Sequence, residues 1–369
     1  MKTLLCVIAA IAFLALPVLA EDVKVSFDGS RLAAGYMDNG SNVGALNNPG
    51  SFVAPDAKLK ATAMLDADTS AVLRLNFDDG MANGADYAYI KMTNVIKKLA
   101  KSDMVNPDIY VGLIKVNHGE ETWSNNSVEN ALVKNSIGGI AGNDLGIEFR
   151  QNALPIELPV TLGYSLSFMN GGSTALVAGD DNNVKAYALK VMGTMKSMPL
   201  YFSLSQYDSG RLVAGSTAAL SNETYDSMIT LLGGFAYIKG YELNVRYDLL
   251  EGAQKFDPTK APLFSDAKAV LRLAYGSGGK GSKNLTPDTT TTMMLDAIYN
   301  VDKQWYVAFR YSSLDLDGDA FTRMSIGGGH RLSDKTILKL DYSTNSEPDT
   351  VAMPEIDNDS VSLLMTVLW

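Results

Sequence analysis

Apolar and polar residues alternate over short stretches along most of the chain. In residues 241–249 every second residue is apolar, and the residues between them are polar or charged. A period of two places the two sets on opposite faces of a β-strand. The same pattern predicts strands at residues 23–36, 57–65, 71–77, 87–93, 109–116, 145–150, 160–168, 185–191, 200–207, 225–237, 241–249, 269–275, 292–299, 305–311, 321–328, 336–342 and 361–369.

The connections between these strands differ in length in a regular way. Residues 66–69, 196–199, 300–304 and 333–334 are tight turns, whereas residues 38–51, 117–142, 170–183, 208–224 and 345–359 are long and polar. Short periplasmic turns and long extracellular loops are typical of an all-β transmembrane barrel with antiparallel strands. Such a barrel has an even number of strands. Because the pattern predicts 17, and the up-down order fails within residues 251–288, we expect 16 strands, with 18 as the alternative.

The two ends of the chain support export to the outer membrane. Residues 361–369 carry one wholly apolar face, which resembles the terminal strand that the barrel-assembly machinery of bacterial outer membranes reads; an edge strand of a soluble sandwich is the alternative. That face consists of Val361, Leu363, Met365, Val367 and Trp369. At the other end, a basic start, an apolar stretch and a small-residue cleavage site predict a signal peptide at residues 1–20. Residues 21–369 then form a single barrel domain.

Composition narrows the possible chemistry. The only cysteine, Cys6, lies in the predicted signal peptide, so disulfides, thiol catalysis and cysteine metal sites are excluded from the mature chain. The two histidines, His118 and His330, have no evident serine partner, and we expect neither an enzyme nor a cofactor. Removing Lys2 with the signal changes the net charge from −10 to −11. This acidity argues against a nucleic-acid partner.

The polar strand faces predict a basic lumen. On the register set by the apolar faces, twelve inward side chains are basic: Lys58, Lys60, Arg74, Lys91, Lys115, Arg150, Lys190, Arg246, Arg272, Arg310, Arg323 and Lys339. The inward acids are fewer: Glu148, Glu242, Asp248, Asp296 and Asp341. Basic groups in a narrow aqueous tube concentrate anions, so we expect a preference for small anionic solutes. The alternative is that these charges only pair with one another across strands.

The loop after Lys115 is the most distinctive segment. Its run His118-Gly119-Glu120-Glu121-Thr122-Trp123-Ser124-Asn125-Asn126 resembles the corresponding stretch of phosphate-selective porins of the O/P type and their relatives. The resemblance implies a loop that folds inward, with Glu120, Glu121, Trp123 and Asn125 near a constriction, and it implies a homotrimer. The chain lacks a tight arginine ladder and a Pro-Phe-Gly-like turn, so the solute stays open, and an ordinary surface loop is the alternative.

Two other interpretations remain. Asp315, Asp317 and Asp319 have a spacing that can hold Ca²⁺, although Asp-Gly is also a common turn signal. For the whole chain, the leading hypothesis is an outer-membrane diffusion channel in contact with lipid. The alternative is a non-conducting barrel that docks a partner, such as a sheath around an electron-transfer protein.

Overall fold

The structure is a computed structural model, and it describes residues 23–37, 51–77, 85–101, 104–120, 127–136, 143–170, 185–208, 239–282, 285–316, 318–346 and 359–369. The predicted signal peptide and the predicted strand at residues 225–237 lie outside these ranges.

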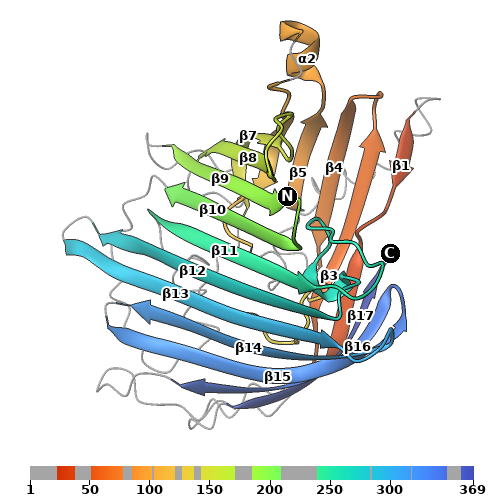
Figure 1. The fold of residues 1–369 in the computed structure, drawn as a ribbon, viewed down its shortest axis with the longest axis vertical. Coiled ribbons are helices and arrows are strands. Elements are labelled where there is room, and N and C mark those ends of the chain that lie inside the picture. Colours follow the sequence, from red (N-terminus) through yellow and green to blue (C-terminus); the bar gives the residue numbers. More distant parts are fainter. Residues whose placement is uncertain are drawn as a thin grey trace, which may run out of the picture.

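Sixteen antiparallel strands form one closed barrel (Figure 1). Each strand pairs with the next along the chain, and β17 pairs with β2 to close the ring. The strands are β2 (Arg31–Met37), β3 (Ser51–Met64), β4 (Thr69–Asn76), β5 (Ala85–Met92), β6 (Asp108–Lys115), β7 (Asn143–Gln151), β8 (Val160–Met169), β9 (Ala186–Met195), β10 (Leu200–Asp208), β11 (Lys239–Leu249), β12 (Ala269–Ser282), β13 (Leu285–Asn300), β14 (Trp305–Leu316), β15 (Asp319–Ser333), β16 (Thr336–Ser346) and β17 (Ser360–Leu368).

The expected number of 16 strands is confirmed, but the expected place of the miscount is wrong. β11 pairs directly with β12, and β12 with β13, so residues 251–288 contain no missing strand. β10 also pairs directly with β11, so the described sheet has no strand between them, where the sequence predicts one at residues 225–237. A short apolar run between polar loops has the composition of a strand whether or not it joins the sheet, and periodicity alone does not separate the two cases.

The first predicted strand is interrupted near the place where β2 and β17 close the barrel. A short strand, β1 (Lys24–Ser26), pairs with the far end of β3, and β2 then continues along the same edge of β3. Between them Gly29 has φ +90°, a conformation that glycine adopts without strain. The backbone N–H groups of Gly29 and Ser30 donate to the Trp369 carbonyl oxygen, at 2.8 and 3.1 Å. These bonds extend the β17–β2 contact beyond the end of both strands.

Loop lengths are sorted between the two ends of the barrel less strictly than the sequence predicts. The end with the tight turns also carries two longer connections, residues 93–107 with the helix α2 (Val95–Ala100), and residues 250–268 with the 3₁₀ helix η3 (Pro262–Phe264). At the opposite end, β12 and β13 are separated by only residues 283–284. Among the described residues, no helix has the length and apolarity to cross a membrane.

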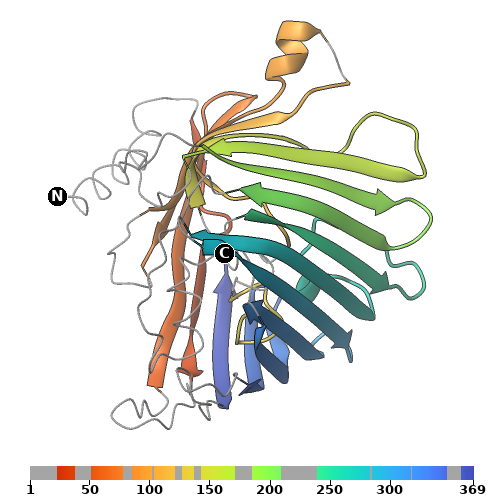
Figure 2. The same cartoon turned by 90° about the vertical axis from the view of Figure 1, so that its left-hand side faces the viewer.

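The α2 connection projects beyond the rim of the barrel and is held there by one carboxylate (Figures 1 and 2). Asp68, in the β3–β4 turn, accepts hydrogen bonds from Thr93 and Asn94, at 3.2 and 2.6 Å, and pairs with Lys98 at 2.5 Å. The Lys98 contact lowers the pKa of Asp68 to about 2, and the Asn94 amide acts in the same direction. Asp68 is therefore ionised throughout the neutral and mildly acidic range.

The alternation in the sequence becomes an apolar exterior and a polar interior. In β11, Tyr241, Leu243 and Leu249 point outward and are 54%, 43% and 49% exposed. Arg246 and Asp248, on the opposite face, are almost completely buried. An antiparallel barrel with an apolar outer band is suited to lipid contact. The soluble-sandwich alternative is wrong, because the sheet closes on itself.

Candidate functional site

A segment that follows β6 folds into the barrel. We call its described residues, 116–120 and 127–136, the inserted loop. Most of these residues are buried, and Leu132 and Asn130 are fully so. A polar loop segment inside a barrel needs partners for its backbone groups, because an unpaired buried N–H or C=O is costly. The wall of the barrel supplies those partners.

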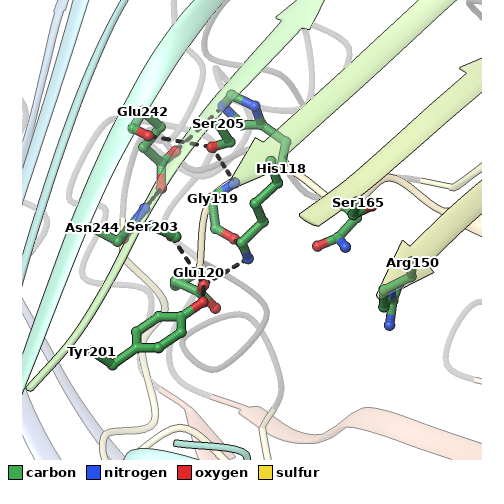
Figure 3. A network of polar contacts seen from close by, with 12 residues as sticks. His118, Gly119, Glu120, Arg150, Ser165, Tyr201, Ser203, Ser205, Glu242 and Asn244 are labelled. Carbon is green, nitrogen blue, oxygen red and sulfur yellow. Dashed lines mark hydrogen bonds and ion pairs between the residues drawn. The ribbon is translucent and has the colours of Figure 1, made fainter. Parts of the chain in front are cut away.

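The first part of the inserted loop is tied to β9 and β10 through Glu120 (Figure 3). Lys190 pairs with the Glu120 carboxylate at 2.6 Å, and Ser203 donates to the same oxygen at 3.1 Å. The Tyr201 hydroxyl donates to it as well. Lys190 also donates to the Gly119 carbonyl oxygen at 2.7 Å. Glu120 is therefore a structural anchor as well as a lumen charge.

His118 lies just before this anchor and is fully buried. Its Nε2 is 3.7 Å from a carboxylate oxygen of Glu242. Burial holds the pKa of His118 well below its usual range, at about 3, and the Lys190 ammonium group acts in the same direction. The imidazole is therefore neutral near pH 7. The nearby Ser205 hydroxyl accepts the Gly119 N–H at 2.9 Å and donates to the Glu242 carbonyl at 3.3 Å, so its hydrogen bonds stabilise the loop.

Lys339 holds the second part of the inserted loop from β16. Its ammonium group donates to the carbonyl oxygens of Ser127 at 2.7 Å and Val128 at 3.0 Å, and to that of Asn130. The Lys339 side chain is completely buried. A lysine has three donors, and all three meet backbone oxygens of one loop. Its charge is therefore used to fix the loop and does not face solute.

Arg310, Arg323 and Asp341 complete this attachment from β14, β15 and β16. Arg310 donates to the Asn130 side chain at 2.9 Å and the Lys134 carbonyl at 3.2 Å. Arg323 donates to the Asn135 carbonyl at 3.1 Å. The Asp341 carboxylate accepts the backbone N–H groups of Val133 and Lys134, at 2.7 and 2.8 Å. The wall thus binds both the donors and the acceptors of the loop backbone.

A second connection enters the barrel from the tight-turn end and meets the inserted loop. Leu263 of η3 and Ala267 pack against Ala131 and Leu132 of the loop, and Val270, Ile298, Tyr306, Ala308 and Ile337 of the wall complete this apolar cluster. Arg246 pairs with Asp248 at 2.7 Å and donates to the Lys260 carbonyl at 2.6 Å, which fastens the connection to β11. The two segments thus meet in one packed cluster inside the barrel, beside β12–β16.

A cavity of about 460 Å³ remains on the opposite side, between the inserted loop and the wall formed by β2–β7. Its lining is rich in charge. Six basic side chains face three acidic ones, and the basic set is Arg31, Lys60, Arg74, Lys115, Arg150 and Lys190. The acids are Glu120, Glu129 and Glu148.

Most of these cations have a fixed acidic partner. Arg31 pairs with Asp56 at 2.6 Å, Arg74 with Asp86, and Arg150 with Glu148 at 2.7 Å. Lys190 pairs with Glu120, as described above. Lys60 and Lys115 differ: among the described residues, no carboxylate lies within ion-pair distance of either ammonium group.

Solved structures resemble this architecture, although no family model and no curated protein sequence matches the chain. The outer membrane channel DcaP of Acinetobacter baumannii superposes with a TM-score of 0.59 at 12% identity, covering 94% of this chain and 97% of that one. OmpT of Vibrio cholerae, in its trimer form, gives 0.56 at 8% identity, with 94% and 99% covered. An anion-selective porin from Comamonas acidovorans gives 0.53 at 13% identity, with 94% and 100% covered.

The chain has the fold of an outer-membrane porin. At these identities the likeness concerns the fold alone, so solute and selectivity have to be argued from the residues of this chain.

Within this porin fold the twelve predicted lumen cations separate into groups. Lys60, Arg74, Lys115, Arg150 and Lys190 line the cavity, whereas Arg272, Arg310, Arg323 and Lys339 bind the inserted loop. Arg246 holds the η3 connection. Lys91 pairs with Asp108 at 2.8 Å, and Lys58 lies 3.8 Å from Asp56. The sequence analysis predicts these twelve residues as one set, because strand register gives the direction of a side chain but not its partner.

The other predicted sites are placed as follows. Glu120 lies inside the barrel beside the cavity, and Glu121, Trp123 and Asn125 lie outside the described residues. Val361, Leu363 and Met365 are exposed on the outer face, with Val367 partly exposed and Trp369 at the rim.

The described residues at the predicted calcium and histidine positions form no assembled site. Asp315 accepts the Gly318 N–H at 2.8 Å, a turn contact. Asp317 lies outside the described residues, and Asp319 begins β15. Within the ranges that the structure describes, no three acidic, histidine or cysteine side chains group as a metal site would require. His330 stacks on Trp305 with ring centroids 4.2 Å apart.

Sequence reasoning missed Arg31 and three lumen tyrosines, Tyr87, Tyr89 and Tyr110. A signal existed for two of them, because Tyr87 and Tyr89 share a strand face with the predicted lumen residue Lys91. Tyr110 and Lys115 both line the cavity although they differ in parity. Gly112, between them, has φ +136° and breaks the alternation, which the sequence alone does not reveal.

Proposed function

We propose that this protein is a passive channel of the bacterial outer membrane, through which small hydrophilic solutes diffuse with a preference for anions. The observation that carries this proposal is the cavity beside the inserted loop, where Lys60 and Lys115 have no ion-pair partner among the described residues. An unpaired ammonium group in a confined aqueous passage raises the local concentration of anions.

The charge available for selectivity is smaller than the sequence suggests. Arg272, Arg310, Arg323 and Lys339 bind the inserted loop, and Arg31, Arg74 and Arg150 each have a carboxylate partner. Glu129, which also lines the cavity, offsets part of the remaining positive charge. We therefore expect a moderate anion preference. The resemblance of the loop to phosphate-selective porins leaves the solute open.

Bilayer recordings test the proposal directly. Under a KCl gradient, the wild-type channel should conduct and its reversal potential should indicate chloride preference. The double variant Lys60→Met/Lys115→Met should lose most of that preference, and Lys335→Met, an exposed lysine in the β15–β16 turn, should retain it. A conducting wild-type channel with cation preference would refute the anion claim, and absence of current would refute the channel claim.

The alternative of a sheath around an electron-transfer protein gains no support from the lumen. Segments of the chain itself pack together inside the barrel next to β12–β16. Two cavities among the described residues, of about 460 and 800 Å³, have the size of small-molecule sites.

The contacts of this chain with lipid, with the assembly machinery and with further copies of itself are also proposals. The apolar outer band would contact lipid, and the outer face of β17 would be read by the barrel-assembly machinery. A homotrimer is consistent with the trimer form of the matched Vibrio cholerae OmpT. Cross-linking of the protein in membranes would test the trimer.

A further inference from the structure

Three tyrosines lie side by side on the wall of the cavity. The interior of a wide barrel is normally polar, and large half-buried aromatic side chains that face a cavity often mark a binding site. Tyr87 and Tyr89 of β5 and Tyr110 of β6 all line the cavity described above. We call these three residues the tyrosine row.

The tyrosine row is continuous across two strands. The ring centroids of Tyr87 and Tyr89 are 5.5 Å apart, and those of Tyr89 and Tyr110 are also 5.5 Å apart with the rings at 66°. Gly112 is the cross-strand partner of Tyr89. Because Gly112 has no side chain, the Tyr89 and Tyr110 rings can approach each other over it. The local sequence thus builds one extended aromatic surface.

Cations flank the tyrosine row at both ends. The Arg74 guanidinium lies 4.1 Å from the Tyr87 ring centroid, and that of Arg150 lies 4.9 Å from the Tyr110 ring centroid. These guanidinium groups have carboxylate partners, Asp86 and Glu148, which hold them in place. Tyr89, in the middle, has neighbouring tyrosines on both sides, and among the described residues no cation lies over its ring. The unpaired charge in the same cavity belongs to Lys60 and Lys115.

We propose that this wall is a binding site for aromatic carboxylates, whose ring would lie against the tyrosine row at Tyr89 while the carboxylate meets the ammonium group of Lys115 or Lys60. The inference rests on the proposed channel function and names a substrate class for it. An inorganic anion would use the lysines and gain nothing from the negative face of an aromatic ring. An uncharged aromatic solute would leave the lysines without an anion.

The test is block of chloride current by organic acids in single channels of the full-length protein. Benzoate should reduce the wild-type current at a concentration about fivefold lower than acetate, the factor expected from one aromatic pair. Cyclohexanecarboxylate, which has a similar size but no aromatic ring, should behave closer to acetate. Equal block by benzoate and acetate, or equal block by benzoate and cyclohexanecarboxylate, would overturn the proposal.

Substitutions test which side chains cause the stronger block by benzoate. Tyr89→Ser should remove the advantage of benzoate over acetate, whereas Tyr89→Phe, which keeps the ring, should retain it. Lys115→Met should weaken block by both acids. Tyr299→Ser, an outward-facing tyrosine that is 46% exposed, is the matched control and should behave as wild type. An unchanged benzoate advantage in Tyr89→Ser would refute the site.

The two levels of the proposal fail differently. A wild-type channel that carries chloride but does not distinguish benzoate from acetate refutes only the aromatic site. A wild-type protein that carries no current refutes the channel function itself.

Discussion

Replacing Lys339 with methionine should release part of the inserted loop. The substitution keeps the length and apolar body of the side chain but removes the ammonium group. The carbonyl oxygens of Ser127, Val128 and Asn130 then lose their shared donor. The more distant part of the loop stays attached, because the Asp341 carboxylate still accepts two backbone N–H groups.

The magnitude follows from the hydrogen bonds. A bond to a charged donor contributes about 1.5–3 kcal/mol, and the three bonds share one ammonium group, so the loss is roughly 3–5 kcal/mol in total. Since 1.4 kcal/mol is a factor of ten, even the lower value raises the population of the released loop roughly a hundredfold. Glu129 lies in the released stretch and lines the cavity, so anion preference should rise with conductance.

Single-channel recording and limited proteolysis measure this effect. Lys339→Met should show higher and noisier conductance, a reversal potential shifted toward chloride, and faster cleavage within the loop by added protease. Lys335→Met makes the same chemical change at an exposed turn position and is the control. If both variants show the same conductance, noise and cleavage rate, Lys339 does not hold the loop.

Three further predictions concern stability. Met365→Lys, on the outer face of β17, should cost about 2–4 kcal/mol of unfolding free energy in lipid, against about 0–1 for Leu332→Lys near the rim; equal urea midpoints would contradict the lipid assignment. Asp68→Asn should speed trypsin cleavage after Lys98. Because the folded pKa of Asp68 is lowered to about 2, its stabilisation of α2 is complete above its ordinary pKa and is lost as pH falls through about 2. Pepsin cleavage of wild-type α2, measured relative to an unfolded substrate at each pH, should therefore rise only there; a rise of this ratio as pH falls from 6 to 4 would contradict the reasoning. Leu263→Ala, in the cluster under the inserted loop, should lower unfolding free energy by about 2–5 kcal/mol, and an unchanged thermal midpoint would show that the cluster is not packed.

Much of the fold follows from the sequence because membrane barrels repeat one local rule. Each strand must place apolar residues toward lipid and polar residues inward. The sequences of β11 and β17 follow this alternation along most of their length. The closed barrel and its 16 strands were predictable on that basis. The place of the miscount was not, because residues 225–237 have the composition of a strand, whereas the described β10 and β11 pair directly with each other.

The candidate site was less predictable, since it depends on contacts between distant segments. Strand register places both Lys339 and Lys115 in the lumen. Only the path of the inserted loop shows that Lys339 binds the loop and that Lys115 has no ion-pair partner among the described residues. Similarly, the strand face of Lys91 indicates that Tyr87 and Tyr89 point inward. The addition of Tyr110 to the same row depends on the break at Gly112, which is a backbone property.

The attachment of the inserted loop also sets an order of folding. Its hydrogen bonds join residues that are far apart in the chain: 175 residues separate Ala131 from Tyr306, and 212 separate Ser127 from Lys339. Contacts with such separations form late, because the intervening chain must first be ordered. The barrel wall from β14 to β16 therefore has to exist before the loop can settle on it. The passage therefore acquires its final width only after this part of the wall has formed.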